Sequence, residues 1–300
     1  MPFYSMPDQE KLYVREIGQG QPVVILSGLG MSSWQWLPFI APHLKKYRFY
    51  IPDYRGFGKS KKCKIPSNPN AIDSHWQDLK ALLPQLNLDS FKLIGYSMGA
   101  TTTMHALKFG DLERSIDQYL HIDQTPKIRN DKDWLFGLYG TQQAQFFDIL
   151  ARLHALLLKY KDYGTLANLP LEIKAQFSKL WIELGQIQGQ QKYLNYLGDS
   201  KIFQQIQPTL LPMQKIDYLL WYLGTYLNHD EDYREALTTL NKPTHFIIGE
   251  QSILYPSEGQ KLIASKLNQS TSYVLKRSGH VPLMTQPLAF AQAISKFLSA

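Results

Sequence analysis

Short apolar runs alternate along this chain with longer segments in which apolar residues recur at helical spacing. The runs predict buried strands over residues 11–17, 22–26, 47–51, 91–94, 119–122, 242–249 and 271–275. The helical spacing predicts helices over residues 36–44, 71–87, 101–109, 261–267 and 289–298. The length of 300 residues allows one large α/β domain or two domains.

One long segment breaks this alternation. From about residue 127 to residue 240 the strand pattern is absent, and helical spacing appears over residues 134–160, 171–187 and 213–227. A segment this long between two strand regions is typical of a lid rather than a loop. We therefore predict a core of residues 1–126 and 241–300 and a helical lid of residues 127–240, whose apolar side chains help to line a pocket.

Composition and charge indicate which compartment and which partners to expect for the chain. Cys63 is the single cysteine, so it forms no internal disulfide, and no His/Cys cluster for zinc lies near it. No secretory leader and no apolar stretch long enough for a membrane span is apparent, so we expect a cytoplasmic protein. The net charge of +7 is partly local, in Lys59–Lys64. This run lacks the interleaved aromatic residues of single-strand binders, so we interpret it as a solvated loop and expect no nucleic acid partner.

The strongest chemical motif is Gly95-Tyr-Ser-Met-Gly99, which follows the predicted strand 91–94 and precedes a predicted helix. This G-x-S-x-G spacing is typical of a sharp strand-to-helix turn that exposes a serine hydroxyl above a sheet. The backbone N–H of Met98 then faces the position of a developing oxyanion. We therefore predict Ser97 as the reactive hydroxyl of the chain.

Other polar residues follow the predicted strands. The glycine loop Ser27-Gly-Leu-Gly30 lets the backbone approach a ligand closely, and the N–H of Leu29 is our candidate for a second oxyanion donor. Asp53 and Arg55 lie in another glycine-rich loop, where we expect them to pair and hold the loop in shape. Asp123 ends the predicted strand 119–122, at the sheet edge where ligands bind in open α/β folds.

Together these motifs resemble the α/β-hydrolase superfamily. The resemblance is carried by Ser27–Gly30 with Trp34 downstream, by Asp53–Ser60, by Gly95–Gly99 and by Ser278–His280. In this order they cover almost the whole chain except the lid. The resemblance implies an α/β fold with an eight-stranded, mostly parallel sheet, helices on both faces and a helical cap inserted after the sixth strand.

The resemblance also implies roles for the site residues. Ser97 is the expected nucleophile, and His280 is the expected general base that takes the serine proton and later gives it to the leaving group. The N–H groups of Leu29 and Met98 are the expected oxyanion hole. No metal or organic cofactor is expected, and the substrate is expected to be a small acyl compound.

The acid of the triad departs from the usual pattern. In this superfamily it commonly follows the seventh strand as G-x-x-D, but the chain reads Gly249-Glu-Gln-Ser252 there. A neutral serine cannot stabilise an imidazolium by charge. Some branches place the acid after the sixth strand, where Asp123 lies. We therefore assign Asp123 as the acid, with Glu250 as the alternative and Glu258 as a third candidate.

These features predict a serine hydrolase that cleaves a carboxylic ester, or a related acyl compound, with an apolar or aromatic group. Two alternatives use the same fold: a cofactor-independent dioxygenase, because some of these place an acid after the sixth strand, and a ligand-binding receptor. Haloalkane dehalogenases are disfavoured because their nucleophile is an aspartate. The glycine loop and Trp34 are also similar to carboxylesterases that act on the pimeloyl methyl ester of acyl carrier protein, a minor option because the acid position differs. The oligomeric state is left open.

Overall fold

The computed structural model describes residues 2–68, 70–187 and 213–300. It divides into two compact units, which are described separately. The first comprises Met1–Asn68, Ile72–Leu138 and Asp230–Ala300 and holds the sheet; the second comprises Pro69–Ala71 and Tyr139–His229 and is helical. The predicted lid spans residues 127–240, and its residues 188–212 lie outside the described part.

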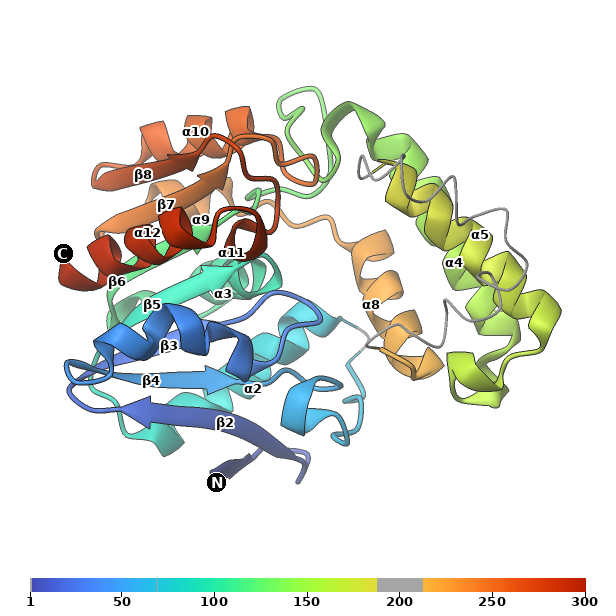
Figure 1. Cartoon of the computed structure of the whole chain (residues 1–300), viewed down its shortest axis with the longest axis horizontal. Helices are drawn as coiled ribbons and strands as arrows, with labels where there is room; N and C mark the ends of the chain where they lie inside the picture. Colours follow the sequence, from blue (N-terminus) through green and yellow to red (C-terminus); the bar gives the residue numbers. More distant parts are fainter. Residues whose placement is uncertain (1, 69, 188–212) are drawn as a thin grey trace. The chain divides into compact units, whose positions relative to one another are not determined.

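The described residues of the first unit form an eight-stranded sheet (Figure 1). The strands are β1 (Phe3–Ser5), β2 (Lys11–Gly18), β3 (Gln21–Leu26), β4 (Tyr47–Pro52), β5 (Phe91–Tyr96), β6 (Ile116–Ile122), β7 (Thr244–Gly249) and β8 (Ser270–Leu275). Their order is β1-β2-β4-β3-β5-β6-β7-β8, with β1–β2 and β2–β4 antiparallel and the other pairs parallel. The carboxyl ends of β5, β6, β7 and β8 therefore meet at one edge of the sheet, which confirms the predicted fold class.

Helices cover both faces of this sheet. They are α1 (Leu37–Ile40), α2 (Ala71–Leu86), α3 (Met98–Phe109), α9 (Arg234–Thr238), α10 (Ser257–Lys266), α11 (Pro282–Thr285) and α12 (Pro287–Ser299), with short 3₁₀ turns η1 (Ser33–Trp36), η2 (Ala41–His43), η3 (Gly58–Ser60) and η4 (Leu112–Ser115). In Figure 1, α12 lies in front of the sheet, and α2 and α3 lie behind it.

The alternation of side chains along β3 explains why both faces are covered. Val24 and Leu26 belong to the core shared with α2, α3, α9 and α10, whereas Val23 and Ile25 belong to the core shared with α1 and α12. All four side chains are at most 1% exposed. A strand buried on both sides has no polar face, which is why the central strands appear in the sequence as continuous apolar runs.

The described residues of the second unit form a packed set of helices: α4 (Gln143–Lys159), α5 (Leu171–Ile187) and α8 (Ile216–Asn228), with turns η5 (Gly140–Gln142), η6 (Lys161–Tyr163) and η7 (Leu166–Asn168). α4 packs against both α5 and α8. Leu153 and Leu157 of α4 are fully buried, as is Phe177 of α5. An ion pair between Arg152 and Glu183 joins the outer faces of α4 and α5.

One part of the helical prediction for this region is wrong. Residues 134–142 form an irregular segment and a short turn, and α4 begins only at Gln143. Trp134 lies in the core of the first unit, and Tyr139 has a left-handed backbone with φ of 62°. Trp134 is therefore apolar because it is buried in the sheet unit and not because it lies on a helix face. None of the described helices has the length and hydropathy that a membrane span needs.

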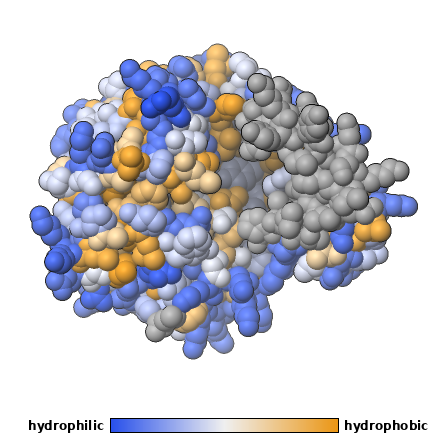
Figure 2. All heavy atoms as spheres, viewed as in Figure 1, coloured by the Kyte–Doolittle hydropathy of each residue, from blue (hydrophilic) through white to orange (hydrophobic). Residues whose placement is uncertain are grey.

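The surface of the first unit is mixed in character. On the face seen in Figure 2, hydrophobic and hydrophilic residues are interspersed in small patches over the sheet-containing unit. Isolated exposed apolar side chains are common on folded domains. Among the larger exposed ones, Leu29 and Met284 also line the pocket beside Ser97 described below.

Candidate active site

Ser97 occupies the sharp turn between β5 and α3. Its backbone has φ of 52° and ψ of −117°, an unusual conformation for a residue other than glycine, and the residue is 7% exposed. A Cβ atom at Gly99 would lie 2.0 Å from the carbonyl oxygen of Leu26, so only glycine lets α3 start this close to β3. The motif read from the sequence therefore forms a strained elbow that holds the hydroxyl at the sheet edge.

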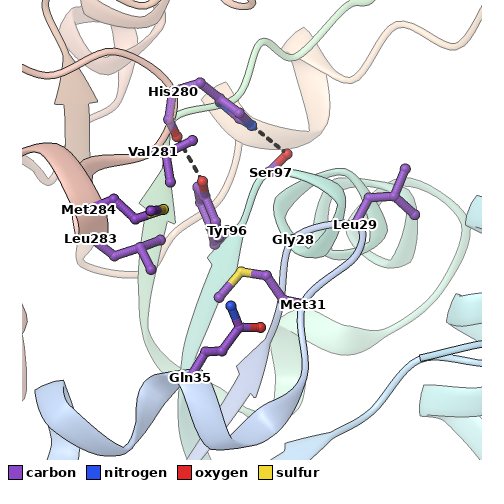
Figure 3. Close-up of a pocket in the computed structure, with 10 residues that line it drawn as sticks. All are labelled: Gly28, Leu29, Met31, Gln35, Tyr96, Ser97, His280, Val281, Leu283 and Met284. Atoms are coloured by element: carbon purple, nitrogen blue, oxygen red, sulfur yellow. Dashed lines mark hydrogen bonds between the residues drawn. The ribbon is translucent and has the colours of Figure 1, made fainter. Parts of the chain in front are cut away.

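Three side chains from distant parts of the chain form one hydrogen-bonded series. His280 Nε2 lies 3.0 Å from Ser97 Oγ, and His280 Nδ1 lies 2.7 Å from Asp123 Oδ2 (Figure 3 shows the first contact). Ser97 follows β5, Asp123 follows β6 and His280 follows β8. The parallel arrangement brings these strand ends together, so the structure juxtaposes the three residues assigned from the sequence.

Asp123 is fully buried and is held by four donors. Oδ1 accepts the backbone N–H of Gly249 at 3.0 Å and the side-chain amide of Gln260 at 3.1 Å. Oδ2 accepts the hydroxyl of Ser252 at 2.7 Å in addition to His280. The backbone of Asp123 has φ of 41°, and the carboxylate reaches the N–H of Gly249 at the end of β7. Four donors on two oxygens fix the orientation of the carboxylate against the imidazole.

The alternative acids lie elsewhere. The side chain of Glu250 pairs with Lys261 at 3.3 Å, and both side chains are about 40% exposed. Glu258 lies at the exposed start of α10. Ser252, which stands where the usual acid is expected, instead donates its hydroxyl to Asp123. The loop after β7 thus supports the carboxylate from β6 without supplying one.

The imidazole of His280 lies between two tyrosines. The Tyr96 ring stacks on it at 5.5 Å with an interplanar angle of 29°, and the Tyr255 ring meets it edge-on at 5.2 Å. The Tyr96 hydroxyl donates to the backbone carbonyl of His280 at 2.7 Å. Burial, with a smaller effect of the Asp123 charge, raises the pKa of Tyr96 well above its usual value, so this hydroxyl keeps its proton. The ring stacking and the hydrogen bond of Tyr96 both hold the loop that carries His280.

A small cavity of about 180 Å³ opens beside Ser97 and His280 (Figure 3). Gly28 and Leu29 form one wall, and a Cβ atom at Gly28 would lie 3.0 Å from the Tyr96 ring, which explains the glycine in this loop. Within the described part of the chain, the N–H of Leu29 forms no hydrogen bond. The N–H of Met98 is in the first turn of α3, where no acceptor within the helix is available. Both candidate oxyanion donors are therefore free to bind a ligand.

The expectation that Asp53 and Arg55 pair with each other is wrong, although both hold loops in shape. Asp53 accepts the backbone N–H groups of Ser33 and Lys59 at 2.5 Å and 2.8 Å. Arg55 is 2% exposed and donates to both carboxylate oxygens of Asp78.

The partners of Arg55 explain why the predicted pair of Asp53 and Arg55 does not form. Besides Asp78 on α2, its guanidinium reaches Asp8 in the turn between β1 and β2. These partners come from other elements, so proximity in the sequence was a poor guide. The residues lie outside the hydrogen-bonded series of Ser97 and contribute to the frame of the sheet.

Tyr96, Tyr255 and Gln260 are among the residues that touch the series and were not predicted as site residues. Tyr96 is the variable second letter of the G-x-S-x-G motif, so the motif itself assigns it no role. Tyr255 lies just before α10 and Gln260 lies within it, and both act through long-range contacts that no local pattern indicates.

Comparison with known proteins places this geometry in a family. The model of the alpha/beta hydrolase fold matches residues 21–287. A pimeloyl-[acyl-carrier protein] methyl ester esterase of Legionella pneumophila is 26% identical over 290 residues, covering 96% of this chain and 99% of that protein. An esterase of Exiguobacterium antarcticum has a similar structure, with a TM-score of 0.65, 20% identity and 99% of each chain covered. A bromoperoxidase of Bacillus anthracis has a TM-score of 0.69 at 21% identity, over 100% of this chain and 99% of that one.

Proposed function

This chain belongs to the α/β-hydrolase-fold family, and we propose that within it the protein is a serine hydrolase that cleaves a carboxylic ester through an acyl-enzyme on Ser97. One observation carries the proposal: the series Ser97 Oγ, His280 Nε2, His280 Nδ1 and Asp123 Oδ2, with contacts of 3.0 Å and 2.7 Å. A hydroxyl, an imidazole and a carboxylate in this order are the parts that nucleophilic acyl transfer needs.

The chemistry follows from the proton positions. Asp123 accepts the Nδ1 proton of His280, so Nε2 carries the lone pair that faces Ser97. As Ser97 Oγ attacks the ester carbonyl carbon, its proton moves to Nε2, and the imidazolium that forms is stabilised by the carboxylate. The proton then passes to the leaving alcohol oxygen as the C–O bond breaks. The N–H groups of Leu29 and Met98 stabilise the oxyanion of the tetrahedral intermediate.

Hydrolysis of the acyl-enzyme repeats these steps with water as the nucleophile. His280 takes a proton from the water and returns it to Ser97 Oγ when the acid leaves. Apart from the ester and water, the groups that act in these steps all belong to the chain. The apolar walls of the adjacent cavity favour an ester with apolar substituents over a highly charged one.

The relatives support a narrower version of this proposal. The relative from Legionella pneumophila is named for a methyl ester of an acyl group on a carrier protein, and so is a relative from Vibrio campbellii that is 22% identical. We therefore include methyl esters of medium-length acyl chains among the substrates to test first. In the sequence resemblance, the acid after β6 is the feature that sets this chain apart from that group.

A cofactor-independent dioxygenase is the second candidate, because Asp123 lies after β6 as the acid of some of these enzymes does. The two reactions differ in their consumption of oxygen. Measuring dissolved oxygen with a heteroaromatic substrate, beside ester turnover on the same preparation, separates them. A ligand-binding receptor would show neither reaction.

A covalent probe tests the proposal without knowledge of the substrate. An activated serine displaces fluoride from a fluorophosphonate, forming a P–O bond, so parent protein should be labelled on Ser97 and Ser97→Ala should not. Ser265→Ala, which removes a hydroxyl on the exposed side of α10, is the matched control and should be labelled like the parent. Turnover of p-nitrophenyl esters should fall at least ~10⁴-fold in Ser97→Ala only. Equal labelling of the parent and Ser97→Ala would refute the proposal.

A further inference from the structure

The cavity beside Ser97 has one polar side chain in its wall that the triad does not use. Apart from the residues around Ser97 and His280, the lining side chains are the apolar Leu29, Met31, Val281, Leu283 and Met284, together with Gln35. In Figure 3, the Gln35 amide points from its turn toward Met31 and the interior of the cavity. An isolated amide in an apolar wall is the kind of group that orients a ligand.

The orientation of this amide is determined by the local structure. The backbone N–H of Ser32 donates to Gln35 Oε1 at 2.8 Å, which closes the start of the turn η1. A backbone N–H can only donate, so the held atom must be the oxygen and the free end must be the NH₂ group. Within the described residues, Gln35 Nε2 donates no hydrogen bond. The cavity therefore contains a fixed donor that awaits an acceptor.

The size of the cavity limits what can bind there. An apolar cavity of about 150 Å³ holds one benzene molecule. A cavity of about 180 Å³ thus accommodates one short substituent of an ester, of roughly six non-hydrogen atoms. A long acyl chain would have to extend outside it.

We propose that this cavity is a specificity subsite for esters with a short substituent that ends in a neutral hydrogen-bond acceptor, such as a ketone or ether oxygen, which Gln35 Nε2 binds. This inference rests on the proposed ester hydrolysis at Ser97. Its physical basis is that an ester lacking the acceptor leaves the amide donor desolvated and unpaired. Gln35 is half-buried, so the discrimination should be about tenfold and not the 10⁴-fold or more of a fully buried polar site.

The experiment compares matched esters that differ in one acceptor. On the acyl side, p-nitrophenyl 4-oxopentanoate is compared with p-nitrophenyl pentanoate; on the alcohol side, 2-methoxyethyl butyrate is compared with butyl butyrate. The parent should prefer the acceptor-bearing ester of at least one pair by about tenfold in kcat/KM. Gln35→Met keeps the volume of the side chain but loses the amide oxygen and the amide NH₂ group, so this preference should disappear.

Gln35→Glu separates recognition from the structure of the turn. A carboxylate still accepts the Ser32 N–H but places an oxygen where the donor was, so the preference should reverse against the acceptor-bearing ester. Gln292→Met, an exposed glutamine on α12, is the control and should keep the parental preference.

The two proposals fail in different ways. If the parent hydrolyses the plain esters through Ser97 but shows no preference within either pair, or if the preference survives Gln35→Met, the subsite is wrong and the ester hydrolase proposal stands. If the parent hydrolyses none of the four esters and is not labelled by a fluorophosphonate, the proposed function fails and the subsite with it. Thermal melts of each variant identify any loss of folding.

Discussion

The carboxylate of Asp123 offers the sharpest test of the site, through its replacement by asparagine. In the parent, Oδ1 faces two donors, the N–H of Gly249 and the amide of Gln260, while Oδ2 faces His280 and the hydroxyl of Ser252. An asparagine keeps only one oxygen. The N–H of Gly249 cannot become an acceptor, so the oxygen should stay on its side, and the new NH₂ group should face His280 Nδ1.

This orientation predicts the size of the effect. Facing an NH₂ donor, His280 Nδ1 becomes the acceptor, and the imidazole proton moves to Nε2, where it blocks removal of the Ser97 proton. The same tautomer error in a serine protease costs about 10⁴-fold in kcat. At about 1.36 kcal/mol per factor of ten, the expected loss in Asp123→Asn is ~5.4 kcal/mol of transition-state stabilisation.

The assay is hydrolysis of p-nitrophenyl butyrate, with burst measurements to count active sites. Glu250→Gln is the matched control: it also removes one negative charge, but from the exposed pair with Lys261, and it should stay within about threefold of the parent. If Asp123→Asn kept a rate within tenfold of the parent, or if Glu250→Gln caused the larger loss, the assignment of the acid to β6 would be wrong.

A second carboxylate position provides a rescue of the same variant. Ser252 Oγ lies 2.7 Å from Asp123 Oδ2, on the side that faces His280. In the double variant Asp123→Asn with Ser252→Asp, the negative charge returns next to the imidazole, and the rate should recover at least about tenfold over Asp123→Asn. Ser252→Asp alone would place two carboxylates in contact and should lower both stability and rate.

Three further predictions concern stability, measured by urea unfolding. Gly99→Ala puts a methyl group 2.0 Å from the Leu26 carbonyl oxygen and should cost at least ~3 kcal/mol; a cost under 1 kcal/mol would contradict the close approach. Arg55→Met leaves the buried carboxylate of Asp78 without its bidentate partner and should lower the free energy of unfolding by ~3–5 kcal/mol. An unchanged urea midpoint in this variant would contradict that expectation. Burial lowers the pKa of His121 from 6.5 to about 4, so the unfolded chain binds a proton at this residue before the folded chain does as the pH falls. The contribution of His121 to the free energy of unfolding is therefore fully present above pH 6.5 and is lost toward pH 4. Through this residue the free energy of unfolding should drop by about 2 kcal/mol between pH 7 and pH 5. His121→Gln should remove that share of the pH dependence, and an identical slope in this variant would show that other groups cause it.

The sequence predicted most of the sheet and the three members of the series, and each success has a local cause. The central strands are buried on both sides, so they appear as apolar runs whose ends can be located within a few residues. Ser97 was found because the elbow requires glycine at close spacing. Asp123 was found because parallel strands bring their carboxyl ends to one edge, a rule of topology that needs no motif. The relatives confirm the enzyme class, a carboxylesterase-type hydrolase.

What could not be predicted depends on contacts between distant segments. Gln260 reaches Asp123 across 137 positions of the chain, and no periodicity indicates such a partner. The same cause misassigned Arg55, whose carboxylate partners are Asp8 and Asp78 and not its neighbour Asp53. The prediction of a helix from residue 134 is wrong because the apolar Trp134 is buried in the sheet unit and does not belong to a helix face.

The hydrogen bonds of Asp123 also bear on how such an enzyme can change over evolutionary time. All four donors to its carboxylate belong to the unit that holds the sheet, and so do Ser97 and His280. The chain leaves that unit after Leu138 and returns at Asp230. We therefore expect that the segment between these points can be shortened, exchanged or recombined with that of a relative while the reactive groups keep their support. We therefore expect inheritance of the chemistry and inheritance of the second unit to be separable, so that exchange of the second unit offers a practical route to new specificities on this sheet.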